Sequence, residues 1–254
     1  MRRRFMFASA LVSLTVAAPA AFADREVTTE ITDPIATSTA GDGGVADNIV
    51  ITSSGRVTRT TVDAAAVTLD SDNSITQNGV ISVVTDTDGG VGVHIVGGNT
   101  GSFTSSSQIQ VSSETFPTDT DGDGDLDGPA GIGGNRIAIL VDGAAVFTGD
   151  IVLAGTSQIV VRGNDSAGLR ILTGIDGSID ASGRFTLVGD RSTAIDIQDD
   201  ISGDVNIGGA ISATGEATVG VSVGGDVGGA ITLTGNINTT GYRFLARPSA
   251  TYLE

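Results

Sequence analysis

The 254-residue sequence contains no cysteine, no tryptophan and no lysine, and only 4% of it is aromatic. Because cysteine is absent, disulfides do not hold the fold together. Basic residues are also few: 13 arginines face 30 aspartates and glutamates, which gives a formal net charge of −17. A chain this acidic repels phosphate backbones, so the composition argues against nucleic-acid binding.

The abundant residues indicate β-structure. The chain has 37 glycines, and its 39% of hydrophobic residues are mostly valine, isoleucine, alanine and leucine. β-Branched residues favour strands, and glycine favours turns. Beyond the N-terminal 23 residues, no segment approaches the ~20 apolar residues that a membrane-spanning helix needs.

Residues 1–23 predict a signal peptide. Three arginines at positions 2–4 precede the apolar stretch FMFASALVSLTVAAPAA, and the small-residue sequence AFA ends at Ala23. This order is typical of a Sec-type signal peptide, with cleavage expected before Asp24. The alternative is an N-terminal membrane anchor, for which the apolar run is short. We therefore expect a protein that is exported through the inner membrane.

A 26-residue repeat organises the rest of the chain. It is marked by equally spaced glycines at Gly163, Gly189, Gly215 and Gly241. A small residue followed by an alternating apolar triplet occurs six times: AVTL at Ala66, GVHI at Gly92, AILV at Ala138, GLRI at Gly168, AIDI at Ala194 and GVSV at Gly220. Three of the five intervals between these tetrads equal the glycine spacing, and the interval from Gly92 to Ala138 is the longest. That interval contains an acidic run, which we expect to leave the stack as a loop.

Alternation within a tetrad buries one face of a short strand. We expect Ile195 and Ile197 to point inward and Asp196 outward, and residues 221–223 to repeat this pattern one coil later. A single coil cannot bury its apolar face alone, whereas stacked coils share a continuous core. The sequence thus predicts an all-β, right-handed parallel β-helix with about 26 residues per coil. A β-sandwich also has alternating strands, but it does not predict a constant period.

The period divides the chain into segments. Residues 1–23 are the signal peptide, and 24–45 form an N-terminal cap or a flexible segment. Residues 46–241 form the coils, with the acidic loop inserted at 113–133. Residues 242–254 are expected to begin a further coil.

The acidic run DTDGDGDLDG holds five aspartates at alternate positions, and we predict that they bind calcium: Asp119, Asp121, Asp123, Asp125 and Asp127. Calcium takes six to eight oxygen ligands, and Gly124 at the sixth position permits the sharp turn of a calcium loop. An EF-hand loop has glutamate at its twelfth position, where this chain has Ala130. The run therefore resembles dockerin or thrombospondin type 3 loops more closely. A solvated acidic loop is the alternative, and the weaker run DTDGG from Asp86 is interpreted as a turn.

Few residues suggest catalysis. The one histidine, His94, lies in the middle of a tetrad, where alternation points it to solvent. Arg170 and Asp196 share an outward position one coil apart, which predicts a stacked ion pair rather than a reaction centre. The sequence has no serine-nucleophile motif, no histidine-containing metal cluster and no phosphate-binding loop. We expect no enzyme, with a carbohydrate-active lyase or hydrolase on the same scaffold as the alternative.

The run GGDVGGAITLTGNINTTGYR at residues 224–243, together with the acidic insertion, resembles the β-helical passenger regions of bacterial autotransporters (type V secretion). The resemblance implies an exported structural or adhesive segment at the cell surface, joined to a C-terminal translocator barrel in the outer membrane. The sequence shows no strands suited to such a barrel, so we expect a fragment. A free periplasmic calcium-binding solenoid is the alternative, and the residues do not indicate which surface ligand an adhesin would bind.

Overall fold

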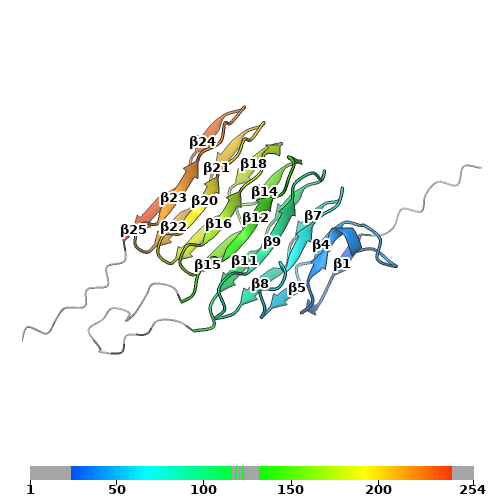
Figure 1. Cartoon of the computed structure of the whole chain (residues 1–254), viewed down its shortest axis with the longest axis horizontal. Helices are drawn as coiled ribbons and strands as arrows, with labels where there is room; N and C mark the ends of the chain where they lie inside the picture. Colours follow the sequence, from blue (N-terminus) through cyan, green and yellow to red (C-terminus); the bar gives the residue numbers. More distant parts are fainter. Residues whose placement is uncertain (1–23, 116–117, 119, 121, 123–131, 242–254) are drawn as a thin grey trace, which may run out of the picture.

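A computed structural model describes residues 24–115, 118, 120, 122 and 132–241. Within these residues the chain is built almost entirely of β-strands, and its helical structure is a single 3₁₀ turn, η1 (Thr37–Thr39). The strands stack side by side along the molecule from the N-terminal to the C-terminal end (Figure 1). The all-β prediction is confirmed.

Three parallel sheets contain nearly all the strands. Sheet A consists, in order, of β1 (Arg25–Val27), β4 (Ile49–Ile51), β7 (Ile75–Gln77), β10 (Phe103–Ser105), β14 (Ile151–Leu153), β18 (Ile179–Ala181), β21 (Val205–Ile207) and β24 (Ile231–Leu233). Sheet B consists of β2 (Glu30–Ile31), β5 (Arg56–Arg59), β8 (Val80–Val84), β11 (Gln108–Ser112), β15 (Gln158–Arg162), β19 (Arg184–Val188), β22 (Ile211–Thr214) and β25 (Ile237–Thr240). Sheet C consists of β3 (Ile35–Ala36), β6 (Val67–Leu69), β9 (Val91–Val96), β12 (Ile137–Asp142), β16 (Ala167–Ile171), β20 (Thr193–Ile197) and β23 (Val219–Val223). A short fourth sheet pairs β13 (Phe147–Thr148) with β17 (Ile175–Asp176).

Each turn of the chain contributes one strand to each sheet, and the paired strands are parallel, so the molecule is a β-solenoid. The pairing register follows the sequence repeat. In sheet C, Leu169 pairs with Ile195 and Ile195 with Val221, so that each partner lies one full repeat further along the chain. In sheet B, Phe185 pairs with Ile211 at the same spacing. The parallel solenoid with its 26-residue period is therefore confirmed.

The six tetrads found in the sequence form six successive strands of one sheet. They correspond to β6, β9, β12, β16, β20 and β23 of sheet C. The longest interval separates β9 from β12, and most of its extra residues lie between β11 and β12. The acidic insertion thus lies in the chain between a sheet B strand and the sheet C strand that follows it.

The first coil comes from residues 24–45, the segment expected to be a cap or flexible. Strands β1, β2 and β3 pair with β4, β5 and β6 respectively. Arg25 pairs with Ile49 of the next coil; Ile49 is fully buried, whereas Arg25 is exposed. Ala40, just after η1, packs against the hydrophobic core and is 9% exposed. The first coil therefore begins the ladder, and its last part, after η1, supplies a side chain that packs against the core at that end.

The core is a set of aliphatic columns between the three sheets. Ile195 and Ile197 are fully buried, as the alternation predicts. A buried isoleucine contributes roughly 1.5–3 kcal/mol through removal of apolar surface from water. Asp196 is on the outer face but is only 8% exposed, because Arg170 and Gln198 both donate hydrogen bonds to its Oδ2 atom.

Glycine at the repeat positions is required by the close stacking of the corners. Gly189 has φ +152°, and a Cβ atom there would lie 1.9 Å from the carbonyl oxygen of Gly163 one coil earlier. Gly163 and Gly215 share this positive φ. The regular glycine spacing therefore marks one corner of the solenoid, between sheets B and C.

Candidate functional site

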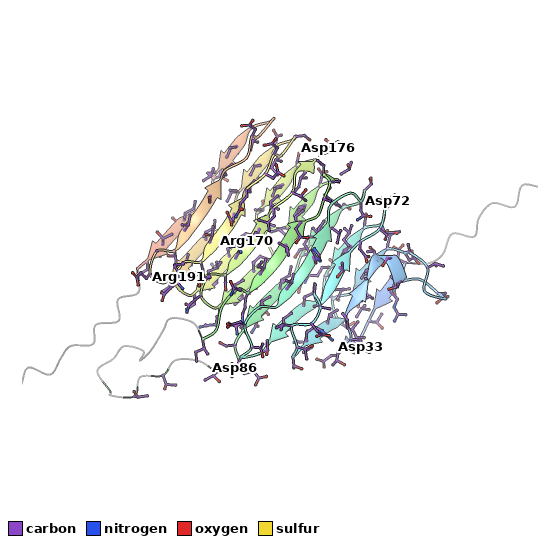
Figure 2. The ribbon with its side chains drawn as sticks, in the orientation of Figure 1. Asp33, Asp72, Asp86, Arg170, Asp176 and Arg191 are labelled. Carbon is purple, nitrogen blue, oxygen red and sulfur yellow. The ribbon has the colours of Figure 1, made fainter. Side chains whose placement is uncertain are left out.

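The predicted calcium ligands Asp119, Asp121, Asp123, Asp125 and Asp127 lie outside the described residues, so the structure leaves their role a prediction. The two ends of the insertion are described. We call them, together with the turn of the preceding coil against which they pack, the excursion root: residues 85–90, 113–115 and 132–136. Figure 2 labels Asp86 there, on the same long edge of the molecule as Arg191.

Two aspartates of the preceding coil hold the two ends of the insertion. The Asp86 carboxylate accepts hydrogen bonds from the backbone N–H groups of Glu114 (2.9 Å) and Thr115 (3.0 Å) and from the Thr115 hydroxyl (2.7 Å). Chiefly because of the bond from the Thr115 N–H, the pKa of Asp86 lies below its usual range. Asp88 accepts a bond from the Gly134 N–H at 2.8 Å on the returning side. The run DTDGG, interpreted from sequence as a turn, therefore anchors the insertion.

A buried arginine completes the root. Arg136 is fully buried, and its guanidinium donates to four backbone carbonyls: those of Ile132 (2.6 Å), Thr85 (2.7 Å), Arg162 (3.0 Å) and Thr87 (3.3 Å). Burial lowers the pKa of Arg136, while the charges of Asp88 and Asp86 oppose that shift. The side chain thus joins the preceding coil, the returning end of the insertion and the following coil.

Sequence reasoning missed Arg136, although a signal was present. The equivalent position is Ser166 in the next coil and Ser192 in the coil after that. The Arg136 N–H donates to the Ser166 hydroxyl, and the Ser166 N–H donates to the Ser192 hydroxyl. An arginine in a column of small polar residues, directly after the insertion, is the irregularity that marks the site.

An acidic groove lies on the opposite long edge, where Figure 2 labels Asp72 and Asp176. Its volume is about 580 Å³. We define the acidic groove by its lining residues: Val146, Thr148, Gly174, Ile175, Asp176, Asp199, Asp200, Ile201, Ser202, Asp226 and Gly228. These come from successive coils, and the half-exposed Val146 side chain supplies apolar surface.

Several of the carboxylates along this edge have structural partners. The Asp176 carboxylate accepts a bond from the Ser202 hydroxyl at 2.7 Å, and Asp200 accepts one from the Asp226 N–H at 2.8 Å. Among the described residues, no group of three or more histidine, aspartate and glutamate side chains is brought together to hold a metal ion. The groove therefore presents separated carboxylates, coil by coil, rather than a convergent ligand set.

A second polar column runs beside the groove. The Asp150 carboxylate accepts a bond from the Ser178 N–H (2.8 Å), the Ser178 hydroxyl accepts one from the Asp204 N–H (3.1 Å), and Asp204 accepts one from the Ala230 N–H (2.7 Å). Each side chain thus satisfies a backbone donor of the next coil where the chain turns into sheet A. Part of the acidic composition is explained by this role.

The outer face of sheet C carries two polar side-chain pairs between neighbouring coils. The predicted stacked pair is confirmed, with Arg170 Nε 3.1 Å from Asp196 Oδ2. His94 faces outward and is half-buried, and its Nε2 atom lies 2.6 Å from Asp142 Oδ1 of the next coil. Both contacts link successive coils, and neither lies among the residues that line the acidic groove.

Comparisons with protein-family models, with curated proteins and with solved structures found no match. The fold class therefore rests on the strand pairing itself. In the part of the chain that the structure describes, no helix is long and apolar enough to cross a membrane.

Proposed function

We propose that this chain is an exported structural segment of a cell-surface protein, a β-solenoid stalk that holds an acidic loop away from its side. The observation that carries the proposal is the anchoring of the insertion: Asp86 and Asp88 bind its two ends, and Arg136 joins three coils at its base. The repeat is interrupted at one place, and both ends of the inserted segment are hydrogen-bonded to the solenoid there. Such an arrangement is suited to presenting the insertion. Exposed loops on a rigid scaffold often carry function.

Export is supported by sequence. The pattern of residues 1–23, the lack of cysteine and the resemblance to autotransporter passengers all favour secretion. Stacking of coils from one end would also help to draw an exported chain outward, because each added coil buries apolar surface. An adhesive role belongs to this proposal, with a ligand that the residues do not identify.

The loop is proposed to bind calcium through the aspartates at 119–127. The root holds the ends of the insertion against one coil, which lowers the entropy cost of closing the loop around an ion. Because the twelfth-position glutamate is missing, we expect an affinity of about 10⁻⁴–10⁻³ M, as in extracellular calcium modules. The ion would offset repulsion between carboxylates two residues apart.

Titration calorimetry of the purified chain with calcium tests this part. We expect saturable binding in the millimolar range, and we expect the double variant Asp121→Asn/Asp123→Asn to lose it. A matched control, Asp199→Asn/Asp226→Asn, removes the same charge from the acidic groove and should bind as the parent does. If the parent shows no heat up to about 10 mM, well above the expected dissociation constant, the calcium site is wrong.

The export proposal is tested in a diderm bacterium that produces the protein. Mass spectrometry of the purified chain should show an N-terminus at Asp24, and protease added to intact cells should cleave the insertion. Cleavage only after the outer membrane is opened would indicate a periplasmic solenoid. A cytoplasmic chain that retains residues 1–23 would overturn export altogether.

A carbohydrate-active enzyme is the second candidate, and the acidic groove favours it. Glycoside hydrolysis uses a pair of carboxylates on either side of the bond that breaks. Asp176, Asp200 and Asp226 offer carboxylates from successive coils along one groove. Turnover of any substrate in a panel of neutral and acidic polysaccharides, lost in Asp200→Asn or Asp226→Asn, would establish this function in place of a purely structural one.

A further inference from the structure

One buried carboxylate at the first coil has an oxygen that receives no hydrogen bond. Asp47 is 8% exposed. Its backbone N–H donates to the Thr37 carbonyl at 2.8 Å, and its Oδ1 atom accepts the Asn48 N–H at 2.8 Å. Its Oδ2 atom is buried, and no group of the described residues donates to it. A buried charge without a partner is costly, so this oxygen calls for a positively charged donor.

The start of β1 lies beside Asp47. The Arg25 N–H donates to the Asn48 carbonyl at 2.9 Å, and the Asn48 side-chain amide donates to Asp24 Oδ1 at 3.0 Å. These two bonds hold Asp24 next to Asn48, the residue that follows Asp47. Asp24 is thereby fixed at the beginning of the β1–β4 ladder, in the first coil of the stack (Figure 1).

Asp24 and Asp47 line the same pocket, whose volume is about 230 Å³. The other charged residues that line it are Arg25, Glu26 and Asp42, so carboxylates outnumber the one guanidinium. Nearby carboxylates favour the charged form of an amine. Arg25 is exposed and does not bond the Asp47 Oδ2 atom. Among the described residues these carboxylates do not converge as a metal-ligand set, so the geometry favours an ammonium group over a metal ion.

Cleavage before Asp24, which the pattern of residues 1–23 predicts, creates such a group. Hydrolysis of the bond between Ala23 and Asp24 consumes one water molecule. It leaves a carboxylate on Ala23, which departs with the signal peptide, and an α-ammonium group on Asp24. The uncleaved chain has a neutral amide nitrogen at this place, whereas the processed chain has a positive charge with three N–H donors.

We propose that the α-ammonium group of Asp24, formed by signal-peptide cleavage, binds the buried Oδ2 atom of Asp47 and completes the first coil. The inference rests on the cleavage that is part of the proposed function. The first coil of the precursor is then less stable than that of the processed chain, because the precursor has no charge here to pair with Asp47. Folding of the stack from this end is thereby coupled to removal of the signal peptide.

The absence of lysine makes the pairing measurable, because the α-amine is the only primary amine of a chain that begins at Asp24. Such a chain can be prepared without export, by removal of an N-terminal tag that leaves no extra residue. An acetylating N-hydroxysuccinimide ester should modify it roughly ten-fold more slowly in the folded chain than in urea, because a pKa raised by one leaves a tenth of the free amine. Asp47→Asn should remove this protection. The matched control Asp42→Asn lines the same pocket and should keep it.

A second measurement uses the parent chain alone, so it holds even if Asp47→Asn does not fold. Reductive methylation with ¹³C-formaldehyde labels the same amine and keeps its charge. The labelled carbon should titrate about one pH unit higher in the folded chain than in the urea-unfolded chain, because an adjacent carboxylate raises the pKa of an amine.

Two results would overturn the pairing. Equal acetylation rates and equal titration midpoints in the folded and unfolded chains would show that the α-amine binds no carboxylate. Full protection in a folded Asp47→Asn chain would show that another group binds it. Failure of the proposed function is seen separately: if mass spectrometry finds residues 1–23 retained in cells, the coupling to processing is wrong, whatever the purified chain shows.

Discussion

Individual side chains in this molecule act mainly between coils. Carboxylates such as Asp204 accept a backbone N–H from the next coil, and Arg136 donates to carbonyls of three coils. Because each position recurs once per coil, one residue type at one corner can satisfy a whole column of backbone groups. A net charge of −17 is thus partly a structural requirement of the corners.

The inward position of Ile195 gives the first prediction. Ile195→Asp places a carboxylate in a fully buried column, and we expect it to lower the free energy of unfolding by more than about 3 kcal/mol. Thermal melting followed by circular dichroism measures the loss. Ser212→Asp, on the exposed outer face of sheet B, is the control and should change the melting temperature little. An unchanged melting curve for Ile195→Asp would rule out the inward assignment.

Arg136 gives the second prediction. Arg136→Met keeps much of the side-chain volume but leaves the carbonyls of Thr85 and Ile132 without this donor, and each unsatisfied buried group costs about 1–3 kcal/mol. We expect a lower melting temperature and faster proteolysis within the insertion. The control is Arg191→Met, which removes an arginine whose partner Asp165 is exposed. It should change neither the melting temperature nor the rate of proteolysis within the insertion. Equal proteolysis of the two variants would contradict the role given to Arg136.

At the scale of strands and loops, the excursion root is sensitive to acid. Hydrogen bonds from Thr115 and Glu114 lower the pKa of Asp86 in the folded protein. The ionised Asp86 therefore stabilises the fold fully at pH values above the pKa of an aspartate in the unfolded chain, about 3.9. This stabilisation is lost as the pH falls through the lower pKa that Asp86 has in the folded protein. The Thr115 amide resonance should therefore titrate with a midpoint below about 3.9. Asp86→Asn should abolish this titration, and Asp33→Asn, at an exposed aspartate, should not; a midpoint above the unfolded value would contradict the bonding.

The sequence predicts some elements far better than others. Sheet C was predictable because its tetrads combine strict alternation with a constant period, and both reflect side chains that pack in columns. The excursion root was not, because Asp86 contacts residues 28 and 29 positions later, and DTDGG has the composition of an ordinary turn. Arg136 likewise meets partners up to 51 residues away. Such contacts depend on the stacking register, which local sequence does not specify.

At the scale of the whole molecule, the coils behave as interchangeable units in one register. Each coil rests on its neighbours, so stability is the sum of coil and interface terms. Residues 189–214 make up one complete repeat. Their removal would bring Leu169 opposite Val221 and Phe185 opposite Ile237, which preserves every inward column.

Deleting residues 189–214 and measuring thermal unfolding by circular dichroism tests directly whether the coils are interchangeable units in one register. We expect a soluble protein that keeps the parent's β-sheet spectrum and a cooperative transition, at a lower temperature because one coil of core is missing. Deletion of residues 189–213, one residue fewer, shifts the register by one and should give an unfolded or aggregated chain. If deletion of the complete repeat also fails to fold, or if both deletions fold equally well, the stacked-coil account is wrong.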